Sequence, residues 1–76
     1  MIEFSDHAKE RNLKRKIPKN WIIKTVKEPE EILNSFRGRK LRRKKFGDKI
    51  LEVVTTNGGN KITVITQYYL GEKNES

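Results

Sequence analysis

The sequence predicts an α+β domain with the order β-α-α-β-β-β, in which two short helices pack on one face of an antiparallel sheet. Three observations lead to this fold class. Two short segments with helical spacing of apolar residues each run up to a proline within the first thirty positions. Residues 49–56 and 61–70 are rich in β-branched and aromatic side chains. The segment Asn57-Gly58-Gly59-Asn60 between them is typical of a tight hairpin turn.

The length and residue content indicate one small domain. The 76 residues are expected to form a single unit over 1–70, followed by a polar tail over 71–76. Because the chain has no cysteine and one histidine, disulfides and thiolate or histidine-rich metal sites are excluded, and we predict neither a metal nor a cofactor. No apolar run approaches the length of a membrane span, which favours a cytoplasmic protein without a membrane partner.

Positive charge is the strongest global feature. Eighteen Lys and Arg residues against ten Asp and Glu residues give a net charge of +8. This charge favours an anionic partner, and its clustering along the chain favours nucleic acid. Surface ion pairs of the kind found in thermophile proteins are the alternative explanation.

The first half of the chain predicts one strand and two helices. Alternating apolar and polar residues predict a short strand over Ile2–Phe4. A helix over 7–17 should end at Pro18, because the residue before a proline avoids the helical region. Asn20 can then cap a second helix that ends before Pro29.

The second half predicts strands and one ambiguous segment. Residues 30–36 combine helical and strand features. Seven of the nine residues from Arg37 to Lys45 are cationic, and we interpret this run as a strand anchored by Leu41 and Phe46. A turn at Gly47-Asp48 and the hairpin over 49–70 follow.

The predicted core draws on every element. Leu13 and Ile17, four residues apart on the first helix, should both face the sheet. Tyr68 is expected to share a face of its strand with Thr66 and Val64, opposite to Tyr69. The apolar residues assigned to the core are Ile2, Phe4, Leu13, Ile17, Trp21, Ile22, Val26, Phe36, Leu51, Val53, Ile62, Val64, Ile65 and Leu70.

The first helix carries a basic stripe. His7, Arg11 and Arg15 are spaced by four residues and therefore lie one above the next on one side of a helix, with Lys14 at the edge of the stripe. This stripe is either a solvated basic face or one wall of a phosphate-binding site.

Several spaced residues resemble a known family. The pattern is His7-Ala8-x-x-Arg11-x-x-x-Arg15-x-Ile17, followed by Phe46-Gly47, Leu51-Glu52-Val53-Val54 and Val64-Ile65-Thr66-Gln67-Tyr68. Over residues 4–70 the chain resembles a widespread family of small prokaryotic domains of unknown function. That family often has a glycine where this chain has Lys16, so the turn between the helices is expected to differ.

The family is similar in size and layout to the RelE and BrnT types of toxin, which are small basic ribonucleases with helices on an antiparallel sheet. The resemblance implies a toxin-like, metal-independent endoribonuclease of the mRNA interferase type. Its partners would be RNA, including ribosome-bound mRNA, and an acidic antitoxin.

Metal-independent RNA cleavage needs a base, an acid and cations that stabilise the charged phosphorane. We assign these roles to His7, Arg11, Arg15 and Tyr68, with Tyr69 or a lysine as an alternative second proton-transfer group. An imidazole exchanges protons near neutral pH, and guanidinium groups match phosphate oxygens. The alternatives are a solvated or structural histidine and arginines paired with nearby carboxylates.

The basic run is the predicted binding segment, because many like charges repel one another unless an anion is near. A non-catalytic nucleic-acid-binding domain and a structural protein whose charge serves solubility remain open as alternatives. The residues assigned to nucleic-acid binding are Lys14, Arg37, Arg39, Lys40, Arg42, Arg43, Lys44 and Lys45.

Overall fold

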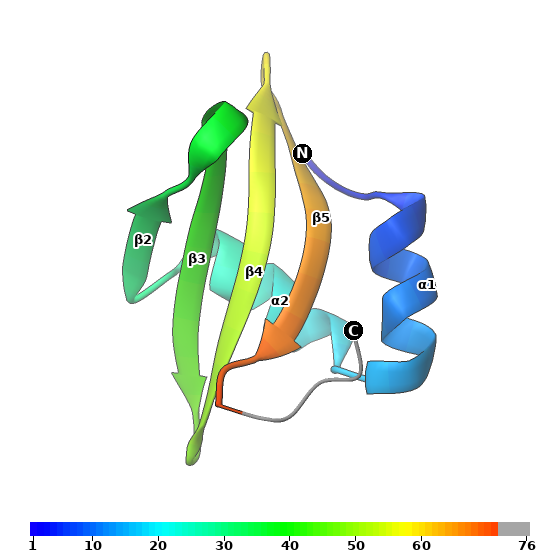
Figure 1. Cartoon of the computed structure of the whole chain (residues 1–76), viewed down its shortest axis with the longest axis vertical. Helices are drawn as coiled ribbons and strands as arrows, with labels where there is room; N and C mark the ends of the chain where they lie inside the picture. The colour runs from blue at the N-terminus through cyan, green and yellow to red at the C-terminus, as the bar shows by residue number, and fades with distance from the viewer. Residues whose placement is uncertain (72–76) are drawn as a thin grey trace.

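The computed structural model describes residues 1–71, which form one five-stranded sheet and two helices (Figure 1). The predicted α+β class is therefore confirmed. The predicted polar tail lies, from residue 72 onward, outside the described residues. The elements in chain order are β1 (Ile2–Phe4), α1 (Asp6–Arg15), α2 (Lys19–Lys27), β2 (Glu31–Asn34), the 3₁₀ turn η1 (Phe36–Gly38), β3 (Arg39–Phe46), β4 (Lys49–Gly58) and β5 (Lys61–Tyr69).

The sheet has the strand order β1-β5-β4-β3-β2. β2, β3, β4 and β5 pair antiparallel with one another along this order, which confirms the predicted antiparallel pairing of β3, β4 and β5. β1 instead pairs in parallel with β5, with Ile2 opposite Ile62, so the prediction of an antiparallel sheet is wrong for this strand. Parallel pairing requires a long crossover, which the two helices and three intervening strands provide. The ambiguous segment supplies β2, a fifth strand that the predicted order lacks.

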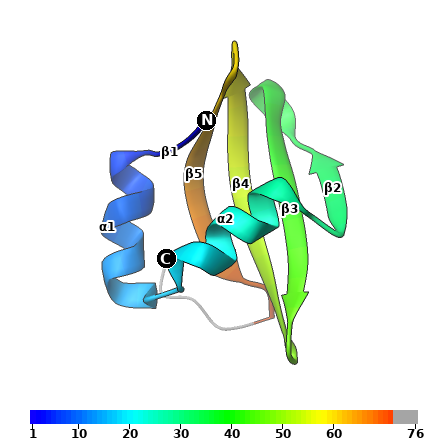
Figure 2. The ribbon, with the colours of Figure 1, turned by 180° about the vertical axis from the view of Figure 1, so that it is seen from behind.

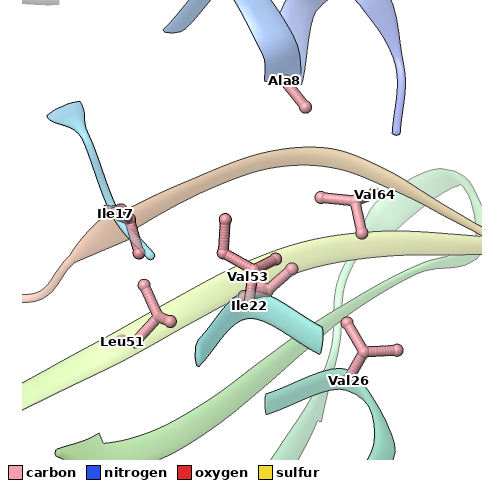
Figure 3. Packing of buried hydrophobic residues seen from close by; sticks show 7 residues of the cluster. All are labelled: Ala8, Ile17, Ile22, Val26, Leu51, Val53 and Val64. Carbon is pink, nitrogen blue, oxygen red and sulfur yellow. The ribbon is translucent and has the colours of Figure 1, made fainter. Parts of the chain in front are cut away.

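The helices leave one face of the sheet uncovered. α2 crosses β4 and β3 on one face, and α1 lies alongside β5, whereas neither of these two helices, which are those of residues 1–71, lies over the face turned to the viewer in Figure 1 (Figures 1 and 2). The core lies between the helices and the sheet (Figure 3). Its buried apolar residues are Ala8, Ile17, Ile22, Val26, Leu51, Val53 and Val64.

α1 begins and ends at clear signals. The Ser5 side-chain oxygen accepts a hydrogen bond from the Ala8 backbone N–H at 3.0 Å, which caps the first turn. The helix ends at Arg15, since Lys16 adopts a left-handed conformation with φ 53° that favours glycine. The predicted shared face of Leu13 and Ile17 is therefore wrong. Ile17 lies beyond the helix and is buried, while Leu13 is 76% exposed.

Side chains of α1 and its cap also close the outer edge of β5, which β1 covers only over Ile62–Val64. The Ser5 hydroxyl donates to the Ile65 carbonyl at 3.1 Å, and the Arg15 guanidinium donates to the Gln67 carbonyl at 2.9 Å. Gln67 in turn donates from its side chain to the Ala8 carbonyl at 3.0 Å. The bonds from Ser5 and Arg15 occupy carbonyls of an edge that would otherwise be open to another strand, and the bond from Gln67 attaches α1 to β5.

Phe36 is a second error in the predicted core, because its side chain is 70% exposed. The residue opens η1, which connects β2 to β3 beyond the end of their pairing. Trp21, in contrast, packs against the core as predicted, and its ring stacks on Phe46 with centroids 4.5 Å apart.

Candidate nucleic-acid interface

The strand geometry of β3 divides the basic run between the two faces of the sheet. Neighbouring residues of a strand point to opposite faces, and residues paired across strands share a face. Val53 and Leu51 of β4 belong to the core under the helices, so the β3 residues paired with them, and the one paired with Thr55, lie on this helix face. The β3 residues paired with Thr56, Glu52 and Ile50 lie on the opposite, uncovered face. Arg39, Arg43 and Lys45 therefore lie on the uncovered face, and Lys40, Arg42 and Lys44 on the helix face.

The three cations of the helix face have partners within the protein. Arg42 donates to the Val26 carbonyl and to the Thr55 hydroxyl, both at 3.0 Å, and Lys44 donates to the Glu28 carbonyl at 3.1 Å. Lys40 donates to the Asn34 side chain at 3.0 Å. Arg42 and Lys44 thus satisfy carbonyls at the C-terminal end of α2, where positive charge is favourable.

A buried carboxylate organises the uncovered face. Glu52 is only 3% exposed and accepts hydrogen bonds from the Tyr68 hydroxyl and, at 2.6 Å, from the Arg43 Nε. Arg43 also forms an ion pair with Glu31 at 3.4 Å. The hydrogen bond to Glu52 raises the pKa of Arg43, while partial burial acts in the opposite direction. Most of the charge of Arg43 is therefore compensated inside the protein.

Tyr68 lies on the uncovered face next to this carboxylate. A register shift after Val54 places Thr66 opposite Val54 and Val64 opposite Thr55, so the expectation that Tyr68 shares a face with Val64 is wrong. Burial, followed by the hydrogen bond to Glu52 and the charge of Glu52, raises the pKa of Tyr68 to about 12. The phenol therefore keeps its proton at neutral pH, which suits a hydrogen-bond donor better than a general base.

The basic stripe of α1 meets this face only at its last member. The guanidinium carbon of Arg15 lies 5.8 Å from the centre of the Tyr68 ring. His7 precedes Arg15 by eight residues, which places it about 12 Å further along the helix axis. Of the four predicted catalytic residues, the structure thus brings Arg15 and Tyr68 together and places His7 and Arg11 along α1. Lys14 is exposed on the last turn of α1, and Arg37 is exposed in η1.

Glu52 is the residue of this site that the sequence-based assignment lacks. The signal in the sequence is a single carboxylate within the apolar strand segment Lys49–Gly58. A charge is rarely fully buried unless it is paired, so this pattern indicates a specific cationic or hydroxyl partner.

Two further features of the described residues concern metal-binding groups and membrane-spanning helices. Across residues 1–71, no group of three or more His, Cys, Asp or Glu side chains could hold a metal ion. No helix in the same residues is long and apolar enough to cross a membrane.

Comparison with protein families gives a match that covers most of the chain. Residues 4–69 match the family model described as a domain of unknown function, DUF4258. Neither the curated proteins nor the solved structures give a match.

Proposed function

For a chain that belongs to the DUF4258 family, a domain of unknown function, we propose RNA binding by the uncovered face of the sheet. The observation that carries this proposal is the position of Arg39 and Lys45 on the face that α1 and α2 leave uncovered. Among the described residues, no ion pair or side-chain hydrogen bond engages either side chain. The net charge of +8 would draw a polyanion toward this face. The predicted location, the cytoplasm, is part of this proposal.

A second candidate, toxin-like RNA cleavage, is favoured by the cluster around Glu52. Arg15 and Arg43 provide cations, and Tyr68 and Glu52 provide groups that exchange protons, all on the same face. Attack of a 2′-hydroxyl on its phosphate needs a proton acceptor at the nucleophile, a donor at the leaving oxygen and positive charge at the phosphorane.

Within this candidate, the groups of the cluster would divide the roles. A phosphate bound by Arg15 would lie beside Tyr68, whose hydroxyl would turn away from Glu52 and give its proton to the leaving oxygen. The Glu52 carboxylate would accept the proton of the attacking 2′-hydroxyl. His7 would act only on a chain that extends along α1. An acidic antitoxin, as the resemblance to the RelE and BrnT toxins implies, would compete with RNA for the same charges.

The binding proposal is tested with two double variants that remove equal charge from opposite faces of β3. Arg39→Gln with Lys45→Gln changes the uncovered face, and Lys40→Gln with Lys44→Gln changes the helix face. Fluorescence anisotropy with a labelled single-stranded RNA should show a larger loss of affinity for the first pair. For the first pair, the slope of the logarithm of the binding constant against the logarithm of the salt concentration should also become shallower by about 1.4, since each of the two lost phosphate contacts contributes about 0.7. Equal losses for the two pairs would overturn the assignment to the uncovered face.

The cleavage candidate is tested by incubating the protein with RNA in EDTA. Catalysis at this cluster would be supported if the wild type cleaves the RNA and if Arg15→Gln and Tyr68→Phe each abolish cleavage. His7→Ala tests separately whether the imidazole contributes. RNA that is bound but remains intact would leave the non-catalytic binding domain as the function. Growth arrest on expression, relieved by a co-expressed acidic partner, would support the toxin role.

A further inference from the structure

One aromatic side chain stands apart from the packing of the others. Six aromatic residues lie within residues 1–71: Phe4, Trp21, Phe36, Phe46, Tyr68 and Tyr69. Trp21 stacks on Phe46 and meets Tyr69 edge-on, with ring centroids 6.4 Å apart. Phe4 packs against the core, and Arg15 lies over the ring of Tyr68. Phe36 is the aromatic residue of this set that is mostly exposed, at 70%.

The backbone around Phe36 is held in an unusual conformation. Arg37 has φ 62° and Gly38 has φ 71°, so two consecutive residues adopt the left-handed region that L side chains rarely occupy. A hydrogen bond between the Ser35 N–H and the Arg39 carbonyl, at 2.9 Å, closes the turn. Glycine adopts this region freely, so the strain lies at Arg37, and strain of this kind often marks a functional segment. Here it presents Phe36 to solvent rather than to the core.

The turn is also placed at the end of the proposed binding face. η1, green in Figure 1, lies at the end of the sheet that carries the β4–β5 turn, on the side of the uncovered face (Figures 1 and 2). Arg39, the first residue of β3, points to that face one residue after the turn ends. Phe36 is thus an exposed aromatic residue that directly precedes Arg37 and lies three positions before Arg39 in the chain.

We propose that Phe36 is a stacking platform for an unpaired base of the RNA, with Arg37 and Arg39 binding the flanking phosphates. This inference rests on the proposed RNA-binding function and specifies its ligand as single-stranded RNA. Aromatic rings interleaved with cations bind single strands because every base has a π-face that can stack. A paired base in a duplex offers no such face.

The test compares Phe36→Leu and Phe36→Trp with the wild-type protein, using anisotropy of a labelled single-stranded RNA of about ten nucleotides. Phe36→Leu keeps apolar volume but removes the ring, and affinity should fall at least about fivefold, since stacking contributes about 1–3 kcal/mol per base. Phe36→Trp should retain affinity, and the introduced indole should be quenched by the RNA. Leu13→Ala, at another exposed apolar residue, is the matched control and should bind as the wild type does.

A second ligand separates stacking from charge. An oligomer with the same number of phosphates but no bases should bind Phe36→Leu and wild type equally. The proposed stacking role of Phe36 would be overturned if Phe36→Leu kept the full RNA affinity, or if it lost the same factor of affinity for the abasic oligomer as for RNA. If the wild-type protein binds no RNA, the proposed function itself fails. Circular dichroism melts check that the variants remain folded, as the exposure of Phe36 leads us to expect.

Discussion

Raising the pH tests the central hydrogen bond of the uncovered face, from the Tyr68 hydroxyl to the Glu52 carboxylate. In the folded protein, burial and Glu52 raise the pKa of Tyr68 from 10.0 to about 12. In the unfolded chain the phenol has its ordinary pKa near 10. The folded state therefore holds the proton more tightly. Its contribution to stability is complete below pH 10 and is lost as the pH rises toward 12.

The magnitude follows from the size of the pKa difference. At about 1.36 kcal/mol per pKa unit, the rise to about 12 corresponds to at most about 2.7 kcal/mol. Because Tyr68 is only half-buried, solvent screens the charge of Glu52, and we expect a loss of about 1–2 kcal/mol.

The assay is urea unfolding followed by the fluorescence of Trp21, for the wild type and Tyr68→Phe, between pH 8 and 11.5. Other phenols and ammonium groups titrate in both proteins, so the difference in unfolding free energy isolates the Tyr68 hydroxyl. The stability advantage of the wild type should be constant up to about pH 9.5 and then shrink. An advantage that stays constant across the whole range would refute the proposed hydrogen bond to Glu52.

Three further variants address other contacts, each measured by urea unfolding and a thermal melt. Glu52→Gln removes a buried negative charge from two hydrogen-bond donors and should lower the free energy of unfolding by about 2–3 kcal/mol. A decrease below about 0.5 kcal/mol, which is on the order of experimental error, would contradict the hydrogen-bond network around Glu52. Arg42→Met keeps an apolar stem but leaves the Val26 carbonyl and the Thr55 hydroxyl without their donor, for a loss of about 1–3 kcal/mol. Lys16→Gly relieves a left-handed φ and should stabilise the protein by about 0.5–1 kcal/mol, whereas a destabilisation would show that the lysine side chain itself is needed.

Local sequence patterns were sufficient for most of the fold. The turn chemistry of Asn57–Asn60 and the β-branched residues around it predict the β4–β5 hairpin, because these signals act over a few residues. The parallel pairing of β1 with β5 joins residues sixty positions apart and leaves no local signal. The spacing of Leu13 and Ile17 fits one face of a helix, but the helix ends before Ile17 because Lys16 is left-handed. A lysine gives no sequence signal for this conformation, which glycine usually adopts.

The sequence predicted which types of residue form the candidate site, but not how their side chains are distributed over the two faces of the sheet. Seven cations in nine residues indicate an anionic partner, yet Arg37 lies in η1 and the alternation of β3 sends three of the other six to each face. The end of α2 determines that Arg42 and Lys44 on the helix face are engaged, since its carbonyls accept hydrogen bonds from both side chains. Tyr68 was predicted as a site residue, while the identity of its partner follows only from the pairing of β4 with β5, which places Glu52 opposite Tyr68.

The bonds from β3 to the end of α2 also constrain the order of folding. Arg42 donates to Val26, and Lys44 donates to Glu28, in each case sixteen residues earlier in the chain. A helix of nine residues is marginal in isolation. α2 therefore completes its last turn only when β3 is docked, so the helix and the strand should form in the same cooperative step. A fragment that ends before residue 39 would lack the side chains that hold α2 closed.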